Sequence, residues 1–132
     1  MKWLRFVIPL AFLSGLVLVA PGQNFAPPPV QAPNEATLDA IRARSTLLND
    51  LIDSLRRKGM RDPVLADIQV YHKAASWIRA LNEFYHAQAG AWTMEALDNG
   101  LLRARQAAAG EYPWLQQAGH AVIRGHRSRI VR

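Results

Sequence analysis

Hydrophobic residues return every three or four positions through the first half of the chain. One stripe of apolar and small side chains comprises Leu38, Ile41, Ser45, Leu48, Ile52 and Leu55, and Leu47 and Leu51 widen it. This spacing places the side chains on one face of a helix. Basic residues at 56–58 followed by Gly59 are typical of a helix C-terminus, where cations oppose the dipole and glycine accepts a positive φ. The pattern predicts an amphipathic helix that begins at Asn34 or Thr37 and ends at Lys58.

A second helix is predicted from Asp62 to about His86. Asp62 is a residue type that caps free amides, and Pro63 suits the first helical position because its missing N–H is not needed there. Apolar side chains then fall on several sides of the helix: Val64, Leu65, Ile68, Val70, Tyr71, Ala75, Trp77, Ile78, Leu81, Phe84 and Tyr85. Such a helix is usually central and packs against more than one neighbour. We therefore expect Leu81 to be a buried residue within this helix.

A third helix is predicted from Thr93 to Gly110. Thr93 is a suitable N-cap, and Trp92 before it can pack on Leu97 as a hydrophobic staple. Gly100 inside the helix costs about 1 kcal/mol relative to alanine, which suggests that a neighbouring helix approaches closely there. The expected buried stripe comprises Leu97, Leu101, Ala104 and Ala108.

The helical pattern ends after Gly110. Residues 112–115 read as a turn that carries two aromatic side chains, and Val122-Ile123 and Ile130-Val131 suit short extended segments. The sequence thus predicts a mainly α fold. It consists of a small three-helix domain at residues 34–118, followed by an extended basic C-terminal tail at residues 119–132.

The first 22 residues have the features of a secretory signal peptide. Lys2 and Arg5 form a positive region, residues 6–20 are apolar, and residues 20–22 offer small side chains for cleavage before Gln23. A retained membrane anchor is the alternative, but the apolar run is short for a span and contains a proline and a glycine. Residues 23–33 hold four prolines and form a Pro-rich spacer. We therefore expect an exported protein, periplasmic or extracellular, that is not held in a membrane after signal cleavage.

The charge pattern argues against a nucleic-acid partner. The formal net charge is +6, from 16 basic and 10 acidic residues. Two basic residues lie in the predicted signal and four in the tail, so the middle of the chain carries ten of each sign. A basic tail alone is weak support for phosphate binding. The chain contains no cysteine, which excludes disulfides, thiolate metal sites and a lipid anchor on cysteine.

No arrangement of catalytic residues stands out. None of the five serines lies in the Gly-x-Ser-x-Gly frame that places a nucleophile beside an oxyanion hole. Glu83 and His86 have the Glu-x-x-His spacing of helical-bundle metal sites, but such sites need matching ligands from other helices. The histidines at 72, 120 and 126 show no such pattern. We expect no enzyme activity from this chain, no metal and no cofactor.

Seven aromatic residues gather in the second half of the chain: Tyr71, Trp77, Phe84, Tyr85, Trp92, Tyr112 and Trp114. They could form a surface for carbohydrate or an aromatic ligand, but a small domain more often uses large side chains to fill its core, and we favour the core. Arginines follow at 124, 127 and 129. Because arginine forms bidentate pairs with carboxylates, these three residues and Trp114 are our candidate interface.

Four short blocks in the chain resemble those of a known family. They are DPVLADIQVYHKAASW at 62–77, NEFY at 82–85, PWLQQAG at 113–119 and RGHRSR at 124–129. Their order resembles the helical N-terminal region of secreted bacterial α/β-hydrolases of the prolyl-oligopeptidase-like peptidase or esterase type. In that family the last block leads into the hydrolase sheet, and the catalytic serine, acid and histidine lie further downstream. The resemblance therefore carries no catalytic residue onto this chain.

Three functions remain open at this point. The resemblance implies a truncated or fragmentary accessory region whose partner is a hydrolase catalytic domain. The alternative is a stand-alone exported helical module that binds a ligand or a protein through its aromatic residues. An independent enzyme is the third and least favoured.

Overall fold

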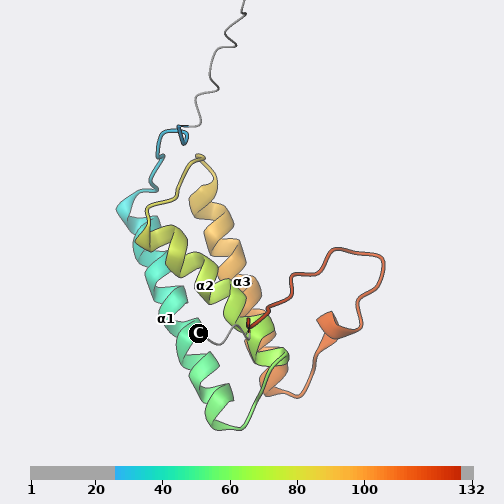
Figure 1. Ribbon diagram of the computed structural model, residues 1–132. Coiled ribbons are helices and arrows are strands. Elements are labelled where there is room, and N and C mark those ends of the chain that lie inside the picture. Colours follow the sequence, from blue (N-terminus) through green and yellow to red (C-terminus); the bar gives the residue numbers. More distant parts are fainter. Residues whose placement is uncertain (1–25, 129–132) are drawn as a thin grey trace, which may run out of the picture.

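The computed structural model describes residues 26–128, which form three helices around one core (Figure 1). Helix α1 spans Glu35–Arg57, α2 spans Val64–Ala80, α3 spans Ala89–Ala108, and a 3-10 turn, η1, spans Pro113–Leu115. Each helix packs against the other two. No β-strand occurs in this range, so the prediction of a mainly α, three-helix fold is confirmed. The predicted signal peptide, the start of the spacer, Arg129 and the Ile130-Val131 pair lie outside the described residues.

Helix α1 forms as its sequence predicts. The Asn34 side chain accepts a hydrogen bond from the backbone N–H of Thr37 at 2.9 Å, which satisfies one of the free amides of the first turn. Gly59 follows the helix with a φ of +89°, a conformation that costs little without a Cβ. Five members of the predicted stripe are buried, namely Ile41, Ser45, Leu48, Ile52 and Leu55, while Leu47 remains exposed.

Helix α2 is shorter than predicted at both ends. It begins at Val64 with Pro63 as N-cap, and the Asp62 carboxylate forms an ion pair with Arg127 at 3.1 Å instead of capping the helix. It ends at Ala80 because Asn82 adopts a φ of +52° and the N–H of Glu83 donates to the carbonyl of Ile78 at 2.8 Å. Reversal through a left-handed residue with this 6→1 hydrogen bond is a Schellman motif. The predicted continuation to His86 was therefore wrong.

Three further side-chain predictions change with these boundaries. Leu81 follows the last residue of α2 and is 63% exposed, so the prediction that it is a core residue was wrong. Helix α3 begins at Ala89, four positions before the predicted cap. Thr93 therefore lies inside the helix, where its hydroxyl donates to the carbonyl of Ala89 at 2.7 Å. Trp92, predicted to be a staple, is 52% exposed.

The core lies between the three helices. Large aliphatic side chains from each helix fill it, and Phe84 from the α2–α3 loop and Trp114 from η1 are buried in the same cluster. Burial of each large apolar side chain contributes about 1.5–3 kcal/mol. The close helix approach predicted at Gly100 is present: a Cβ there would lie 2.7 Å from Cδ2 of Leu48 and 2.9 Å from Cβ of Tyr71.

The segment after α3 loops away from the helices and returns to them (Figure 1). Gly110 ends α3 with a φ of +79°, as predicted. After η1 the chain reverses and residues 124–127 reach α2, where the backbone of Gly125 contacts Ala66 and Asp67. Between residues 26 and 128, none of the helices combines the length and the hydropathy that crossing a bilayer would require.

Candidate functional site

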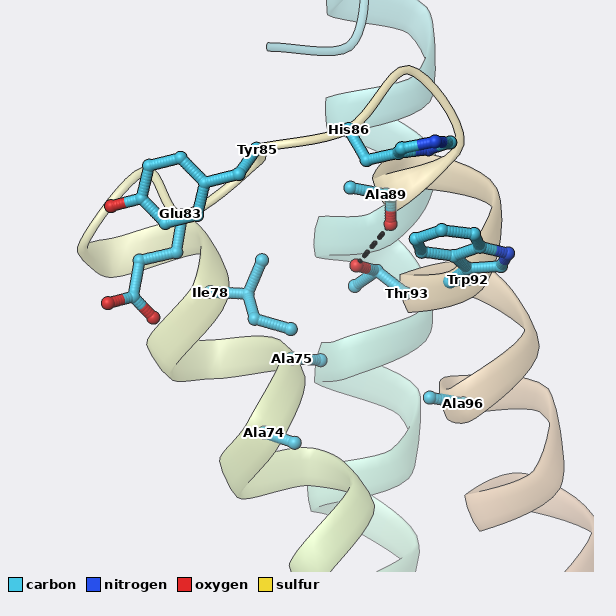
Figure 2. A pocket seen from close by; sticks show the side chains of 10 residues that line it. All are labelled: Ala74, Ala75, Ile78, Glu83, Tyr85, His86, Ala89, Trp92, Thr93 and Ala96. Carbon is cyan, nitrogen blue, oxygen red and sulfur yellow. Dashed lines mark hydrogen bonds between the residues drawn. The ribbon is translucent and has the colours of Figure 1, made fainter. Parts of the chain in front are cut away.

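The Glu83 and His86 pair lies on the α2–α3 loop and lines a pocket between these two helices (Figure 2). The pocket has a volume of about 290 Å³. A metal site with the Glu-x-x-His spacing would need both residues on one face of a helix. Because α2 ends at Ala80, Glu83 and His86 lie beyond the helix and do not share a helix face. In the described part of the chain no three metal-binding side chains lie together.

Small side chains form the floor of this pocket. Ala74 and Ala75 come from α2, and Ala89, Thr93 and Ala96 come from α3. Ile78 and Tyr85 lie on one side, and the stacked rings of His86 and Trp92 lie on the other (Figure 2). The centroids of these two rings are 4.7 Å apart, at an interplanar angle of 18°. The backbone N–H of Gln88 donates to Nδ1 of His86 at 3.1 Å, which fixes the orientation of the imidazole.

The aromatic residues divide between core and surface. Tyr71, Phe84 and Trp114 are buried, as the core interpretation predicted. Trp77 and Trp92 are more than half exposed, which that interpretation did not predict, and Tyr85 is also exposed. The ammonium of Lys73 lies 4.4 Å from the ring centroid of Trp77, a cation–π contact on the surface of α2.

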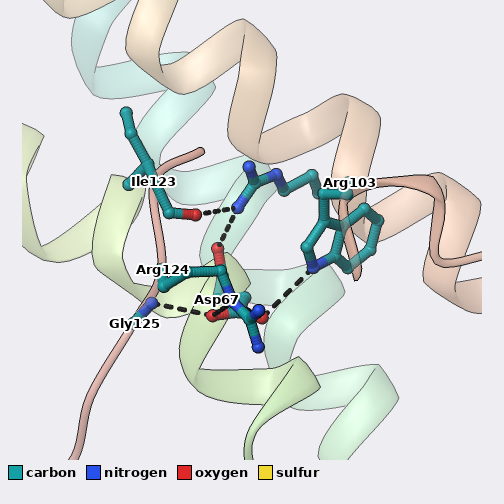
Figure 3. A network of polar contacts seen from close by, with 6 residues as sticks. Asp67, Arg103, Ile123, Arg124 and Gly125 are labelled. Atoms are coloured by element: carbon teal, nitrogen blue, oxygen red, sulfur yellow. Dashed lines mark hydrogen bonds and ion pairs between the residues drawn. The ribbon is translucent and has the colours of Figure 1, made fainter. Parts of the chain in front are cut away.

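A second candidate site centres on Asp67, a carboxylate on α2 whose side chain is 0% exposed (Figure 3). Its oxygens accept hydrogen bonds from Arg124 Nε at 3.0 and 2.9 Å, from the Gly125 N–H at 2.8 Å and from the Trp114 indole N–H at 3.2 Å. A buried carboxylate is stable only when charge and hydrogen bonds compensate its lost hydration. Here all three donors come from the segment after α3.

Arg103 supports the same junction from α3. Its guanidinium donates to the carbonyl oxygens of Asp67, at 3.2 Å, and Ile123, at 2.8 Å, and so joins α2 to the returning segment (Figure 3). It also lies 5.0 Å from the ring centroid of Tyr71 and 5.1 Å from that of Trp114. Burial raises the pKa of the Tyr71 hydroxyl above its usual value of 10, and the nearby positive charge of Arg103 partly offsets this effect.

Gly125 allows the returning segment to lie directly on the helix backbone. A Cβ at this position would overlap the Ala66 carbonyl and lie 2.8 Å from the backbone nitrogen of Asp67. Only glycine permits this approach without moving the segment. Two residues later, Arg127 donates to Oε1 of Gln69 at 2.7 Å and pairs with Asp62. We call the contacts of Arg124, Gly125 and Arg127 with α2 the Asp67 clamp.

The structure thus brings together three of the four residues in the predicted interface. Trp114 and Arg124 meet at Asp67, Arg127 contacts Gln69 on the same helix, and Arg129 lies outside the described residues. Sequence reasoning missed Asp67, Arg103 and Gly125. A signal for Asp67 was present, because it is an isolated acid within the otherwise apolar start of α2.

Comparisons with known proteins do not assign this chain to a group. No family of proteins matches it, and no significantly similar curated protein or solved structure was found.

Proposed function

We propose that this chain is a non-catalytic helical accessory region of a secreted α/β-hydrolase. The observation that supports this is the Asp67 clamp, which uses a buried carboxylate to hold the segment at 123–127 against α2. In the resembled family this segment is the junction to the catalytic domain. A junction fixed in this way would set the orientation of a following domain relative to the helices.

The chemistry of the clamp suits a structural role better than a catalytic one. Both Asp67 oxygens already accept hydrogen bonds, and the carboxylate has no access to solvent. A general base or a nucleophile must reach the substrate atom on which it acts. The arginines are likewise engaged, Arg124 with Asp67 and Arg127 with Gln69 and Asp62.

Hydrolase assays on the purified mature protein test the non-catalytic part of this proposal. We expect p-nitrophenyl acetate and chromogenic peptides to be hydrolysed at the rate in buffer alone, because acyl transfer needs an activated nucleophile and donors for the oxyanion. Turnover above that rate, lost when one serine or histidine is replaced, would refute the accessory role.

The coding sequence that follows Arg132 tests the hydrolase part. An in-frame continuation that encodes a Gly-x-Ser-x-Gly motif would support the proposal, whereas an intergenic region would favour the stand-alone binding module. In the longer protein, Asp67→Asn should separate the thermal unfolding of the helical region from that of the catalytic domain. Asp98→Asn, which removes an exposed ion pair with Arg44, is the matched control and should leave the two transitions coupled.

A further inference from the structure

We propose that the pocket between α2 and α3 binds a small organic amine, that is, an apolar body with one cationic nitrogen. This site goes beyond the accessory role and does not depend on it. Ile78 in the pocket and Asp67 in the clamp are on the same helix but about 16 Å apart along its axis. Loss of one site would therefore leave the other intact.

The floor of the pocket selects an apolar body. Four of its five residues are alanines, and the fifth, Thr93, already donates its hydroxyl proton to the carbonyl of Ala89. The volume of about 290 Å³ exceeds the roughly 150 Å³ of a cavity that binds benzene. One substituted ring or a short branched alkyl group therefore fits.

The walls provide aromatic faces for a cation. Trp92 and Tyr85 lie on opposite sides of the pocket and both are exposed to solvent (Figure 2). Aromatic rings attract a cation through their quadrupole, and tryptophan does so most strongly. The His86 stack holds the Trp92 ring in place, and the hydrogen bond from Gln88 holds His86. The pocket is thus preorganised, which lowers the entropic cost of binding.

The charge at the pocket favours cations over anions. Glu83 is the one acidic residue among those that line it, and no lysine or arginine lines it. Within residues 26–128 the Glu83 carboxylate forms no ion pair, as is also true of Asp50, Glu95 and Glu111, so its place at the pocket is what distinguishes it. The Glu83 side chain lies on the Tyr85 side of the pocket, opposite Trp92 (Figure 2). An amine whose apolar body covers the alanines and whose nitrogen meets the Trp92 ring is therefore attracted to Glu83 across the pocket.

Lys73 and Trp77 show the same chemistry elsewhere in this protein. There an exposed tryptophan on α2 holds a lysine ammonium at 4.4 Å from its ring centroid. Trp92 is similarly exposed and stacks on the imidazole of His86, but no lysine or arginine lines the pocket beside it. An external amine would supply the missing cation.

Three small molecules that share a phenylethyl group and differ in charge test the proposal. Phenethylamine, 2-phenylethanol and 3-phenylpropionate are titrated into the isotope-labelled mature protein, and amide chemical shifts are followed by NMR. We expect the amine to bind with a Kd of about 1 mM and to shift the amides of residues 74–96. The alcohol and the acid should bind at least about fivefold more weakly.

Substitutions then connect the affinity to the pocket. Glu83→Gln should weaken amine binding about three- to fivefold and leave the alcohol unchanged. Glu95→Gln, an exposed acid on α3 outside the pocket, is the matched control and should change neither. Ala74→Leu, at an exposed position that lines the pocket, should abolish binding of all three molecules without unfolding the protein.

The proposal is overturned by any of four results, of which the first three concern affinity. These are no amine-induced shifts at about 10 mM, equal affinity for the amine and the alcohol, or equal effects of Glu83→Gln and Glu95→Gln. Shifts that map to the Asp67 clamp instead of residues 74–96 would also overturn it. None of these results would bear on the hydrolase assay, so the two proposals fail separately.

Discussion

Replacing Asp67 with asparagine tests whether the buried carboxylate holds the C-terminal segment on α2. The substitution keeps the size and shape of the side chain but removes its charge and turns one oxygen into an NH₂ group. In the structure both oxygens face donors: Arg124 Nε contacts both, Gly125 N–H contacts one and the Trp114 indole N–H contacts the other. Either orientation of the amide therefore places an NH₂ against a donor.

The expected cost follows from how deeply each partner is buried. Trp114 is 4% exposed, so its N–H cannot easily find water if Asp67 stops accepting. Leaving a buried donor without a partner costs about 1–3 kcal/mol, and hydrogen bonds to a charged group contribute about 1.5–3 kcal/mol each. The side chain of Arg124 is 47% exposed and can return to water, which reduces its share. We expect Asp67→Asn to lower the free energy of unfolding by about 2–4 kcal/mol.

Thermal and urea unfolding, followed by circular dichroism, measure this loss. A domain of this size should melt about 10–20 °C lower. The matched control is Asp98→Asn, which breaks the 2.7 Å ion pair with Arg44 on the surface, where both side chains are more than a third exposed. That control should cost less than about 1 kcal/mol. Equal losses for the two variants would refute the clamp.

Three further predictions follow from burial and close packing. Leu97→Ala should lower the free energy of unfolding by about 2–5 kcal/mol because Leu97 is 0% exposed. Leu81→Ala should change it by less than about 0.5 kcal/mol because Leu81 is 63% exposed, and similar urea midpoints for the two variants would contradict this burial pattern. Gly100→Ala should lower the free energy of unfolding by about 1–3 kcal/mol, although alanine has the better helix propensity, because its Cβ would lie 2.7 Å from Cδ2 of Leu48. A rise in the melting temperature would argue against this packing. Burial lowers the pKa of His72 below its usual value of 6.5, so protonation of His72 favours the unfolded chain. The free energy of unfolding should therefore decline as the pH falls from 6.5 through the pKa of the folded state. Urea unfolding of His72→Gln over the same pH range should show a smaller decline.

The sequence by itself was sufficient for features that depend on neighbouring residues. Gly59 and Gly110 mark helix ends through contacts within one turn of the backbone, and the stripe of α1 follows from helical periodicity. For the start of α1 the sequence left Asn34 and Thr37 open, and the structure shows Asn34 as the cap. The end of α2 was also encoded locally, because Asn82 is a residue type that tolerates positive φ, but the apolar residues after it outweighed this signal in our interpretation.

Tertiary structure alone decided what becomes of the charged and aromatic side chains. Arg124 lies 57 residues from Asp67 in sequence, and Trp114 lies 47 residues from it, so no local pattern pairs them. Periodicity gives the direction of a side chain from its own helix but not what another segment places over it. The return of the segment after α3 buries Asp67, and the spacing of α2 and α3 leaves Trp92 at an open pocket. Both outcomes depend on where distant segments meet, which residue spacing does not specify.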